Sequence, residues 1–309
     1  MKDPGRTPID RRRLVASAVA LACMGVAGLA LRRASAEPPG DLLGTMGLHV
    51  AGDDDTLPDL AVDNDLGYGE VLAANPGIDP WLIPRGTVIV LPAAHLLPAS
   101  ARRGIVVNLG DQRLYFFQRR AVSSFPIGIA VEERDMRLGT TRIARKREHP
   151  AWYPPPSVRE ESPWLPDVVP PGPDNPLGSR ALYLEWPRVL IHGTNKPYGV
   201  GRRVSHGCIR LYEPDIAALY RDAAVGLPVT FVFEPVKLGW ASGVLYLEIH
   251  PTLDQIDALE NGEAVDRDEP AGLRDRVLAA AAEAAGRIDW DVVALAARRR
   301  NGIPVAIVR

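Results

Sequence analysis

The chain has 309 residues, of which 46% are hydrophobic and 24% charged, and its net charge is −2. This length fits one large domain or two to three small ones, and the composition is that of a folded protein. Without residues 1–36, which are interpreted below as an export signal, 29 basic and 36 acidic residues remain, a net charge of −7. This balance excludes nucleic acid as the expected partner, because binding to phosphates needs a basic surface.

The N-terminus has the pattern of an export signal. Three arginines at positions 11–13 precede an apolar run over residues 14–31, and the small-residue pattern ASA follows at positions 34–36. A positive start, an apolar middle and a small-residue cleavage site are typical of a signal peptide, so we expect cleavage after about Ala36. The apolar run is long enough for a retained membrane anchor, which is the alternative.

The use of cysteine points to a functional thiol. The chain has two cysteines, and Cys23 lies inside the apolar run. Cleavage of the signal leaves Cys208 without a disulfide partner in an oxidising compartment, and such a leftover thiol indicates function. A buried, inert cysteine is the alternative, but serine, histidine, glycine and arginine surround Cys208 rather than aliphatic residues.

Residues 46–93 form the first predicted module. We expect a short strand, a helix that begins near Leu57, a second helix that ends at Asn75-Pro76-Gly77, and a strand over residues 87–91. This βααβ order resembles the LysM module, a small glycan-binding fold. The matching features are Asp55-Thr56-Leu57, Leu60-Ala61, Asn75-Pro76-Gly77 and the closing Pro84, Gly86, Val88 and Val90-Leu91-Pro92. The usual Gly-Asp-Thr-Leu opening reads Asp54-Asp55-Thr56-Leu57 here, and a spacer or docking domain without a ligand is the alternative.

From residue 104 the chain alternates between apolar and polar residues, which is typical of β-strands. The predicted strands cover residues 104–109, 112–117, 121–129, 180–186, 188–192, 228–233 and 243–249. The Pro-rich stretch over residues 150–178 is predicted to be a loop that covers the active site. A helix is expected between Pro214 and Gly226, and two alanine-rich helices over residues 273–285 and 290–300 predict a helical C-terminal tail.

Three of the eight histidine and cysteine residues, the types most able to do proton or thiol chemistry, lie in the Gly-rich segment 191–211: His192, His206 and Cys208. A thiol becomes a strong nucleophile when a neighbouring base takes its proton and stabilises the thiolate. We therefore assign His192 as the general base that orients and activates Cys208. The backbone carbonyl of Gly193 is predicted to hold the other ring nitrogen of His192 and to set its tautomer.

The remaining residues of the segment predict a substrate and oxyanion site made of Ser205, His206, Gly207 and Arg210. A turn at Gly207 would aim the amides of Gly207 and Cys208 at a developing oxyanion. Arg210 offers a fork of donors that suits a carboxylate. The expected chemistry is acyl transfer through a thioester: Cys208 attacks, one amine leaves, and a second amine takes the acyl group.

Three alternatives compete with this interpretation. A zinc site made of His192, His206 and Cys208 would need a fourth ligand or water, and no second Cys or His pair flanks the segment, so we predict no metal. In the second alternative, His192 and His206 have only a structural role. In the third, Arg210 forms an ordinary ion pair and binds no substrate.

The string HGTNKPYGVGRRVSHGCIRL at residues 192–211 resembles the signature of the L,D-transpeptidase catalytic domain, also called the YkuD domain. The resemblance extends to the ErfK/YbiS/YnhG group of periplasmic L,D-transpeptidases. It rests on the LysM-like start, Gly104-Ile105-Val106-Val107-Asn108, Leu114-Tyr115, Pro126-Ile127-Gly128-Ile129, the run VPPGPDNPLG at residues 169–178, and Glu234-Pro235-Val236-Lys237.

The resemblance implies a mainly β, β-sandwich-like catalytic domain over residues 102–236 with one or two packed helices. A small βααβ LysM-like domain would precede it, and a C-terminal subdomain over residues 237–309 would follow. The resemblance also implies a periplasmic location, no cofactor, and a tetrapeptide stem of peptidoglycan as the donor, cleaved between diaminopimelate and D-alanine. Cys208 would be the nucleophile, His192 the base and Gly193 its backbone partner, with His206 and Arg210 lining the substrate site.

The acceptor is expected to be the terminal lysine of an outer-membrane lipoprotein, and a 3→3 crosslink between stems is the alternative. Two other functions remain open. One is a papain- or NlpC-like hydrolase, although those families place the cysteine before the histidine and His192 comes first here. The other is a non-catalytic wall-binding protein with residues 48–92 as the binder.

Overall fold

The computed structural model describes residues 40–100, 102–131, 137–205, 207–263, 265 and 268–308, and the backbone of residues 35–36. The expected export signal lies outside the described residues, apart from those last two positions. No helix in the described part of the chain has both the length and the apolar character needed to cross a bilayer.

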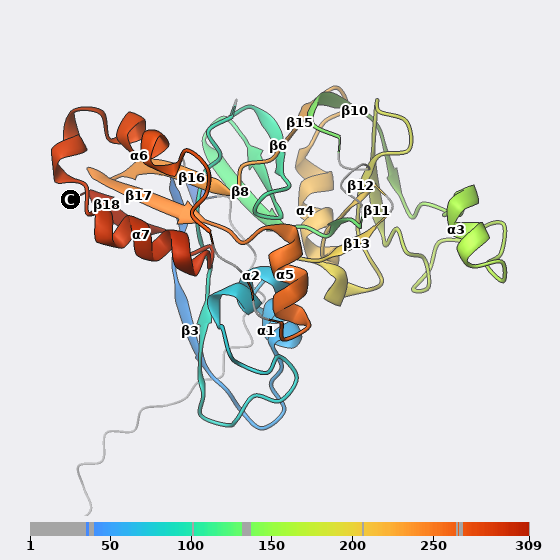
Figure 1. Ribbon diagram of the computed structural model, residues 1–309. Helices are drawn as coiled ribbons and strands as arrows, with labels where there is room; N and C mark the ends of the chain where they lie inside the picture. Colours follow the sequence, from blue (N-terminus) through green and yellow to red (C-terminus); the bar gives the residue numbers. More distant parts are fainter. Residues whose placement is uncertain are drawn as a thin grey trace, which may run out of the picture. The chain divides into compact units, whose positions relative to one another are not determined.

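A mixed nine-stranded sheet forms the body of the molecule and confirms the mainly β fold class (Figure 1). Its strands are β1 (Ser35–Ala36), β6 (Gly104–Asn108), β7 (Arg113–Phe117), β8 (Ala121–Pro126), β10 (Gly139–Glu148), β11 (Arg180–Leu184), β12 (Leu190–His192), β14 (Ile209–Arg210) and β15 (Pro228–Val232). Their order across the sheet is β1-β8-β7-β6-β15-β10-β11-β12-β14. Two neighbouring pairs are parallel, β6 with β15 and β12 with β14, and the others are antiparallel.

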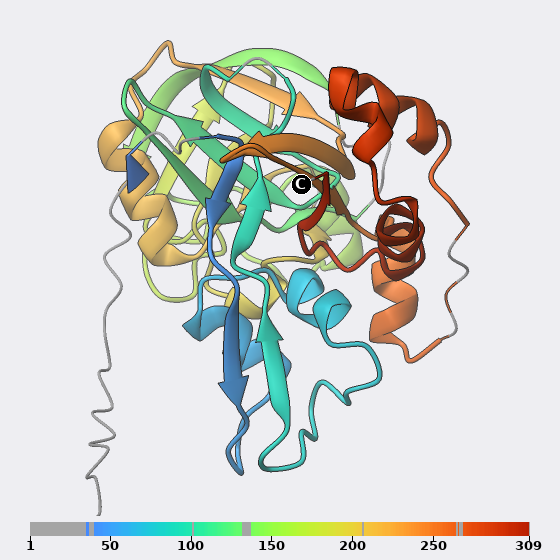
Figure 2. The same ribbon diagram turned by 90° about the vertical axis from the view of Figure 1, so that its left-hand side faces the viewer.

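The sheet curls, so that strands far apart in its order share one apolar core (Figure 2). Helix α4 (Glu213–Asp222) packs on the sheet near β11 and contributes Ile216 and Leu219 to this core. Pro214 lies in its first turn, as predicted. A short parallel pair, β9 (Ile129–Ala130) with β13 (Arg203–Ser205), lies beside the main sheet.

The predicted βααβ order is present between residues 47 and 91. It consists of β3 (Gly47–Val50), α1 (Leu57–Asp63), α2 (Tyr68–Ala74) and β4 (Val88–Leu91), with β3 and β4 antiparallel. The side chain of Thr56 caps α1 by accepting from the backbone amide of Asp59. A separate pair, β2 (Leu42–Gly44) with β5 (Ala94–Leu96), flanks this module on both sides in the sequence.

The C-terminal region contains more strand than the predicted helical tail. Strands β16 (Val236–Ala241), β17 (Val244–Ile249) and β18 (Val305–Val308) form an antiparallel sheet. Helices α6 (Leu273–Ala281) and α7 (Trp290–Arg299) pack on it, with a 3₁₀ turn over Ala282–Arg287 between them. Helix α5 (Leu253–Glu260) packs against α2 instead. The apolar faces of α6 and α7 share a core with this sheet (Figure 1). Strand β18 is not predicted from the sequence, because a four-residue apolar run becomes a strand only where the edge of a partner strand is available.

Candidate active site

Two neighbouring parallel strands carry the predicted catalytic residues. Strand β12 ends at His192, and Cys208 directly precedes β14. Ile191 pairs with Ile209, and His192 pairs with Arg210. Both isoleucines are buried in the main core, so alternation along the strands puts His192, Cys208 and Arg210 on the opposite face. The fold thus puts Cys208 and His192 on the same face of two neighbouring strands, although sixteen positions separate them in the chain.

The ring of His192 is buried and held in one orientation. Its Nδ1 lies 2.6 Å from the carbonyl oxygen of Gly193, the contact that the sequence predicts. With Nδ1–H as the donor, Nε2 is left as a proton acceptor. Burial lowers the pKa of His192 to about 4, against the effect of the Gly193 hydrogen bond and with a further contribution from the charge of Arg210. The imidazole is therefore neutral near pH 7 and able to act as a base.

The thiol of Cys208 is also neutral in the resting structure. Its Sγ donates to the carbonyl oxygen of Arg188 at 3.6 Å. Burial raises the pKa of the thiol, although a backbone hydrogen bond at Leu190 and the charge of Arg210 act in the opposite direction. Transfer of the proton to His192 consequently requires the thiol to leave the Arg188 carbonyl.

The turn before Cys208 has the geometry that the sequence predicts for Gly207. Gly207 has a φ of +103°, a conformation that L-residues with a side chain rarely adopt. The hydroxyl of Ser205 donates to the carbonyl oxygen of Cys208 at 2.6 Å and closes the turn. The predicted residue His206 lies outside the described residues.

Arg210 is a half-buried cation beside the thiol. Its backbone is held by two hydrogen bonds with Gly128, at 2.9 and 3.0 Å. Its Nε has no hydrogen-bond partner, and no carboxylate of the described residues forms an ion pair with it. Burial lowers the pKa of Arg210, while the Cys208 thiol acts to raise it. The alternative in which Arg210 forms an ordinary ion pair is therefore not supported by any carboxylate in the described part of the chain.

The thiol borders a cavity of about 360 Å³. Its lining residues are Arg145, Arg147, Ala151, Trp152, Tyr153, Pro155, Leu177, Tyr183, Arg188, Leu190 and Cys208. Five of them belong to the Pro-rich stretch, which includes helix α3 (Pro156–Glu161), so this stretch lies beside the thiol as predicted. Asn175 holds the stretch together, because its side-chain amide donates to the carbonyls of Pro150, Val169 and Pro170.

The arginines of the cavity are functional candidates that the sequence patterns do not single out. Arg145 and Arg147 come from β10, a strand outside the predicted ranges, and Arg188 comes from the turn before β12. The run TTRIARKRE in β10 is too highly charged to indicate a strand by apolar alternation. The signal available in the sequence is the spacing of two between Arg145 and Arg147, which puts both on one face of a strand.

Comparison with known proteins decides the family. Residues 102–231 match the YkuD family, the L,D-transpeptidase catalytic domain. The chain is 36% identical over 266 residues to the probable L,D-transpeptidase YbiS of Escherichia coli (strain K12), which covers 83% of this chain and 84% of that protein. It belongs to the L,D-transpeptidase family.

This L,D-transpeptidase has further relatives. It is 37% identical over 250 residues to the probable L,D-transpeptidase ErfK/SrfK of E. coli (strain K12), with 78% of each chain covered. Among solved structures, a mutant L,D-transpeptidase of Enterococcus faecium is similar at 17% identity and a TM-score of 0.34, over 49% of this chain and 55% of that one.

In this L,D-transpeptidase the N-terminal module braces the loop between His192 and Cys208. The hydroxyl of Tyr198, in the 3₁₀ turn η2 (Pro197–Gly199), donates to Asp59 of α1 at 2.5 Å. The backbone amides of Tyr68 and Gly69 donate to the carbonyls of Val200 and Gly201 at 3.1 and 3.2 Å. A Cβ at Gly201 would lie 2.3 Å from the Tyr68 nitrogen, so only glycine permits this approach.

The same loop of the L,D-transpeptidase is fastened from two other sides. Arg203 donates to Asp254 and Asp257 of helix α5. At the other end, the carboxylate of Glu213 accepts from the backbone amide of Thr194 at 2.9 Å and from Ser179 at 3.1 Å. These contacts fix the chain on both sides of the His192 and Cys208 strands.

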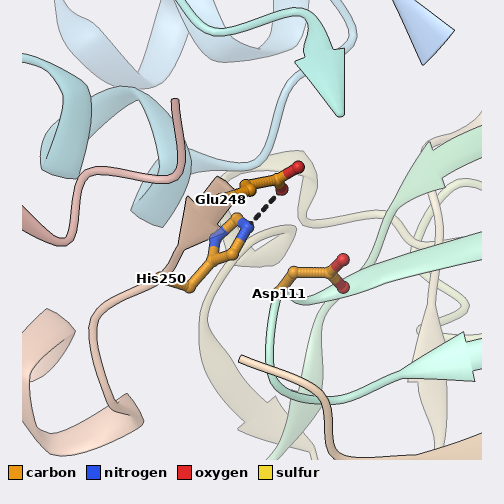
Figure 3. A group of neighbouring side chains, drawn as sticks. All are labelled: Asp111, Glu248 and His250. Carbon is orange, nitrogen blue, oxygen red and sulfur yellow. Dashed lines mark hydrogen bonds and ion pairs between the residues drawn. The ribbon is translucent and has the colours of Figure 1, made fainter. Parts of the chain in front are cut away.

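One group in the described residues has the geometry of a metal site. Ligand atoms of Asp111, Glu248 and His250 lie within 4.8 Å of one another. Figure 3 shows the His250 ring turned to the Glu248 carboxylate, while Asp111 comes from the separate turn between β6 and β7. The ammonium of Lys237 already neutralises both carboxylates, at 2.7 Å from Asp111 and 2.8 Å from Glu248. The residues present therefore fit a buried lysine and not an additional divalent cation.

Proposed function

We propose that this L,D-transpeptidase transfers the peptidyl group of a peptidoglycan tetrapeptide stem from D-alanine to a new amine through a thioester on Cys208. The observation that carries the proposal is the face shared by β12 and the start of β14, which holds the thiol and, on the neighbouring strand, a neutral imidazole with one accepting nitrogen. A cavity of about 360 Å³ beside the thiol offers room for the peptide.

In the first half-reaction the thiol gives its proton to Nε2 of His192 while Sγ attacks the carbonyl carbon of diaminopimelate. The oxyanion then collapses, the C–N bond to D-alanine breaks, and the imidazolium returns the proton to the leaving amine. The amides of Gly207 and Cys208, on the turn closed by Ser205, would stabilise the oxyanion. Since both resting groups are neutral, charge separates only as the attack proceeds.

Arg210 is proposed to bind a carboxylate of the stem close to the reacting carbonyl, together with His206. Its half-buried guanidinium beside the thiol, without a carboxylate partner among the described residues, supports this role. A bound carboxylate would neutralise the cation that burial leaves uncompensated.

In the second half-reaction an acceptor amine attacks the thioester, loses a proton to His192, and releases the thiol. We propose the terminal lysine of an outer-membrane lipoprotein as this acceptor, on the strength of the resemblance to the ErfK/YbiS/YnhG group. Muropeptide mass spectrometry of cells with and without the protein separates this acceptor from the amine of a second stem. Lysine-bearing peptides attached to the wall support the lipoprotein, and 3→3 crosslinked dimers contradict it.

We also propose that residues 1–36 export the protein to the periplasm and that the βααβ module binds wall glycan as a LysM module would. An open groove between residues 53–55 and 81–84 supports the second point, because the exposed Trp81 can stack on a sugar ring. Sedimentation of the full protein with purified sacculi should weaken on Trp81→Ala. Unchanged sedimentation would contradict glycan binding at this groove.

The central test is release of D-alanine from a tetrapeptide stem by the wild type, Cys208→Ala and His192→Gln. We expect no release by Cys208→Ala, and a loss of at least about a hundredfold for His192→Gln, since general-base catalysis contributes about 10²–10⁴-fold. Intact-mass measurement should show a peptidyl adduct on the wild type. Equal release by the wild type and Cys208→Ala would refute the mechanism, and water as the main acyl acceptor would indicate a hydrolase.

A further inference from the structure

The main sheet brings a row of side chains from β10 to the thiol. Arg145 of β10 pairs with Tyr183 of β11, and Tyr183 pairs with Leu190 of β12. The parallel register of β12 and β14 then sets Cys208 beside Leu190. Partners that stand opposite each other point to the same face of a sheet, so Arg145 shares the face of the thiol. Both line the same cavity.

A second row runs parallel to the first. Arg147 pairs with Ala181, Ala181 with His192, and His192 with Arg210. Arg147 therefore lies on the same face as the proposed base, at the same end of the cleft as Arg145. The residue between the two arginines, Lys146, turns away and donates to carbonyls at the C-terminal end of helix α4.

The side chains of Arg145 and Arg147 are exposed, and no carboxylate of the described residues neutralises them. None of the described residues forms a hydrogen bond or an ion pair with either guanidinium, although both line a cavity. The guanidinium of Arg145 lies over the ring of Tyr183, 3.4 Å from its centroid. Stacking on the ring fixes the plane of the guanidinium and leaves its N–H edge available for an anion.

The separation of this guanidinium from the thiol can be compared with the length of the diaminopimelate side chain in the proposed donor stem. Neighbouring strands lie about 4.8 Å apart, so Tyr183, two strands from β14, is offset from the thiol by about 10 Å across the sheet, and the guanidinium stacks on its ring. An extended diaminopimelate side chain carries its distal carboxyl carbon about 7 Å from the reacting carbonyl, and a hydrogen bond adds about 3 Å. The reach of the ligand is therefore of the same order as the offset across the sheet.

We propose that Arg145, held on Tyr183 and assisted by Arg147, binds the distal carboxylate of the diaminopimelate residue in the donor stem. This inference rests on the proposed function and adds the specificity of its site. The row selects donors whose third residue ends in a free carboxylate over donors in which that group is an amide. The fork of Arg145 recognises both carboxylate oxygens, whereas an amide offers one acceptor and a competing donor.

The test compares two donor stems that differ only at this group, one with a free distal carboxylate and one with a carboxamide. D-alanine release is measured for the wild type, Arg145→Gln, Arg145→Lys and Arg120→Gln. Arg120 is exposed and has no side-chain partner among the described residues, so its variant controls for the loss of one positive charge. Thermal unfolding of each variant checks that the fold is retained.

We expect the wild type to prefer the free acid in kcat/KM by about tenfold or more, the range of a hydrogen bond to a charged group. Arg145→Gln should lose this preference through a higher KM for the free acid, with the amide stem unaffected. Arg145→Lys should keep part of the preference, and Arg120→Gln all of it.

An equal loss on both stems in Arg145→Gln, or no preference in the wild type, would overturn the recognition role while leaving the transpeptidase intact. Failure of the wild type to release D-alanine from either stem would overturn the proposed function itself, and the recognition role with it.

Discussion

Replacement of Lys237 by methionine should destabilise the protein strongly, because it removes the cation from a buried cluster. The ammonium donates to the carbonyl of Leu96, to Asp111 and to the hydroxyl of Tyr115, and it forms an ion pair with Glu248, all at 2.7–2.9 Å. Lys237 is 2% exposed, Asp111 3% and Glu248 0%. Methionine fills a similar volume but leaves two buried carboxylates without a counter-charge.

The expected loss is about 3–5 kcal/mol, the range for removing one partner of a buried ion pair. It amounts to a fifth or more of the free energy of unfolding of a typical domain, which is about 5–15 kcal/mol. Burial acts to raise the pKa of Glu248, and Lys237 together with the His250 hydrogen bond outweighs it, so the pKa of Glu248 is lowered in the wild type. Without Lys237 the only lowering influence left at short range is the His250 hydrogen bond, so we expect burial to prevail and the pKa of Glu248 to rise.

This change gives the destabilisation a pH dependence of known sign. A carboxyl with a raised pKa in the folded state binds its proton more tightly when folded, so the variant loses stability as pH rises above the ordinary carboxyl range near pH 4. The wild type, whose Glu248 has a lowered pKa, loses the corresponding stability only as pH falls through that range. The difference between the two proteins should therefore grow from pH 5 to pH 7.5.

Urea unfolding at pH 5 and pH 7.5 measures this difference. Lys196→Met is the matched control, since Lys196 is exposed and its side chain has no partner among the described residues; it should change stability by about 0.5 kcal/mol at most. A loss below about 1 kcal/mol for Lys237→Met at pH 7.5, or the same loss at both pH values, would refute the assignment of Lys237 as the cation of the cluster.

Three further predictions concern the site itself. A carbapenem mimics the acyl donor, so intact-mass spectrometry should show one adduct on the wild type and none on Cys208→Ala; an adduct on both would place the reaction elsewhere. The folded pKa of His192, about 4, lies below its ordinary 6.5, so the unfolded chain binds this proton first as pH falls. The stability due to His192 should therefore be complete above pH 6.5 and decline by about 3 kcal/mol toward pH 4, and the pH dependence of unfolding should flatten in His192→Gln; an unchanged slope would contradict the shift. Gly201→Ala should lower both stability, by about 1–3 kcal/mol, and D-alanine release, because its φ is +81° and its Cβ would meet the Tyr68 nitrogen. Gly226→Ala, with φ +85° and open space around the Cβ, isolates the backbone contribution, and equal effects of the two changes would argue against the contact with Tyr68.

Sequence patterns between near neighbours were sufficient to predict the mainly β class, most strands of the sheet and the βααβ order of the N-terminal module. These features depend on alternation, turn residues and helix starts, such as Pro214 in the first turn of α4, that act between near neighbours in the chain. The same holds for the pairing of His192 with the Gly193 carbonyl and for the turn at Gly207, since each lies within a few residues of its partner. Strands β10, β16 and β18 and helix α5 lie outside the predicted ranges. Charge masks the alternation in β10, and β18 is a short apolar run that needs a partner edge. The alternation of Val236, Leu238 and Trp240 in β16 and the capping box of α5 are local signals that the prediction missed.

Residue types and their spacing were enough to indicate the candidate reactive groups of this L,D-transpeptidase: one thiol, a histidine ahead of it, and the glycine and arginine that flank the thiol. The surroundings of these groups, in contrast, depend on how the chain folds. The register across β10, β11, β12 and β14 joins Arg145 to Cys208 from 63 positions away, and burial sets the pKa of His192 near 4. Both effects depend on which strands become neighbours and which side chains lose contact with water, and the curled sheet decides both.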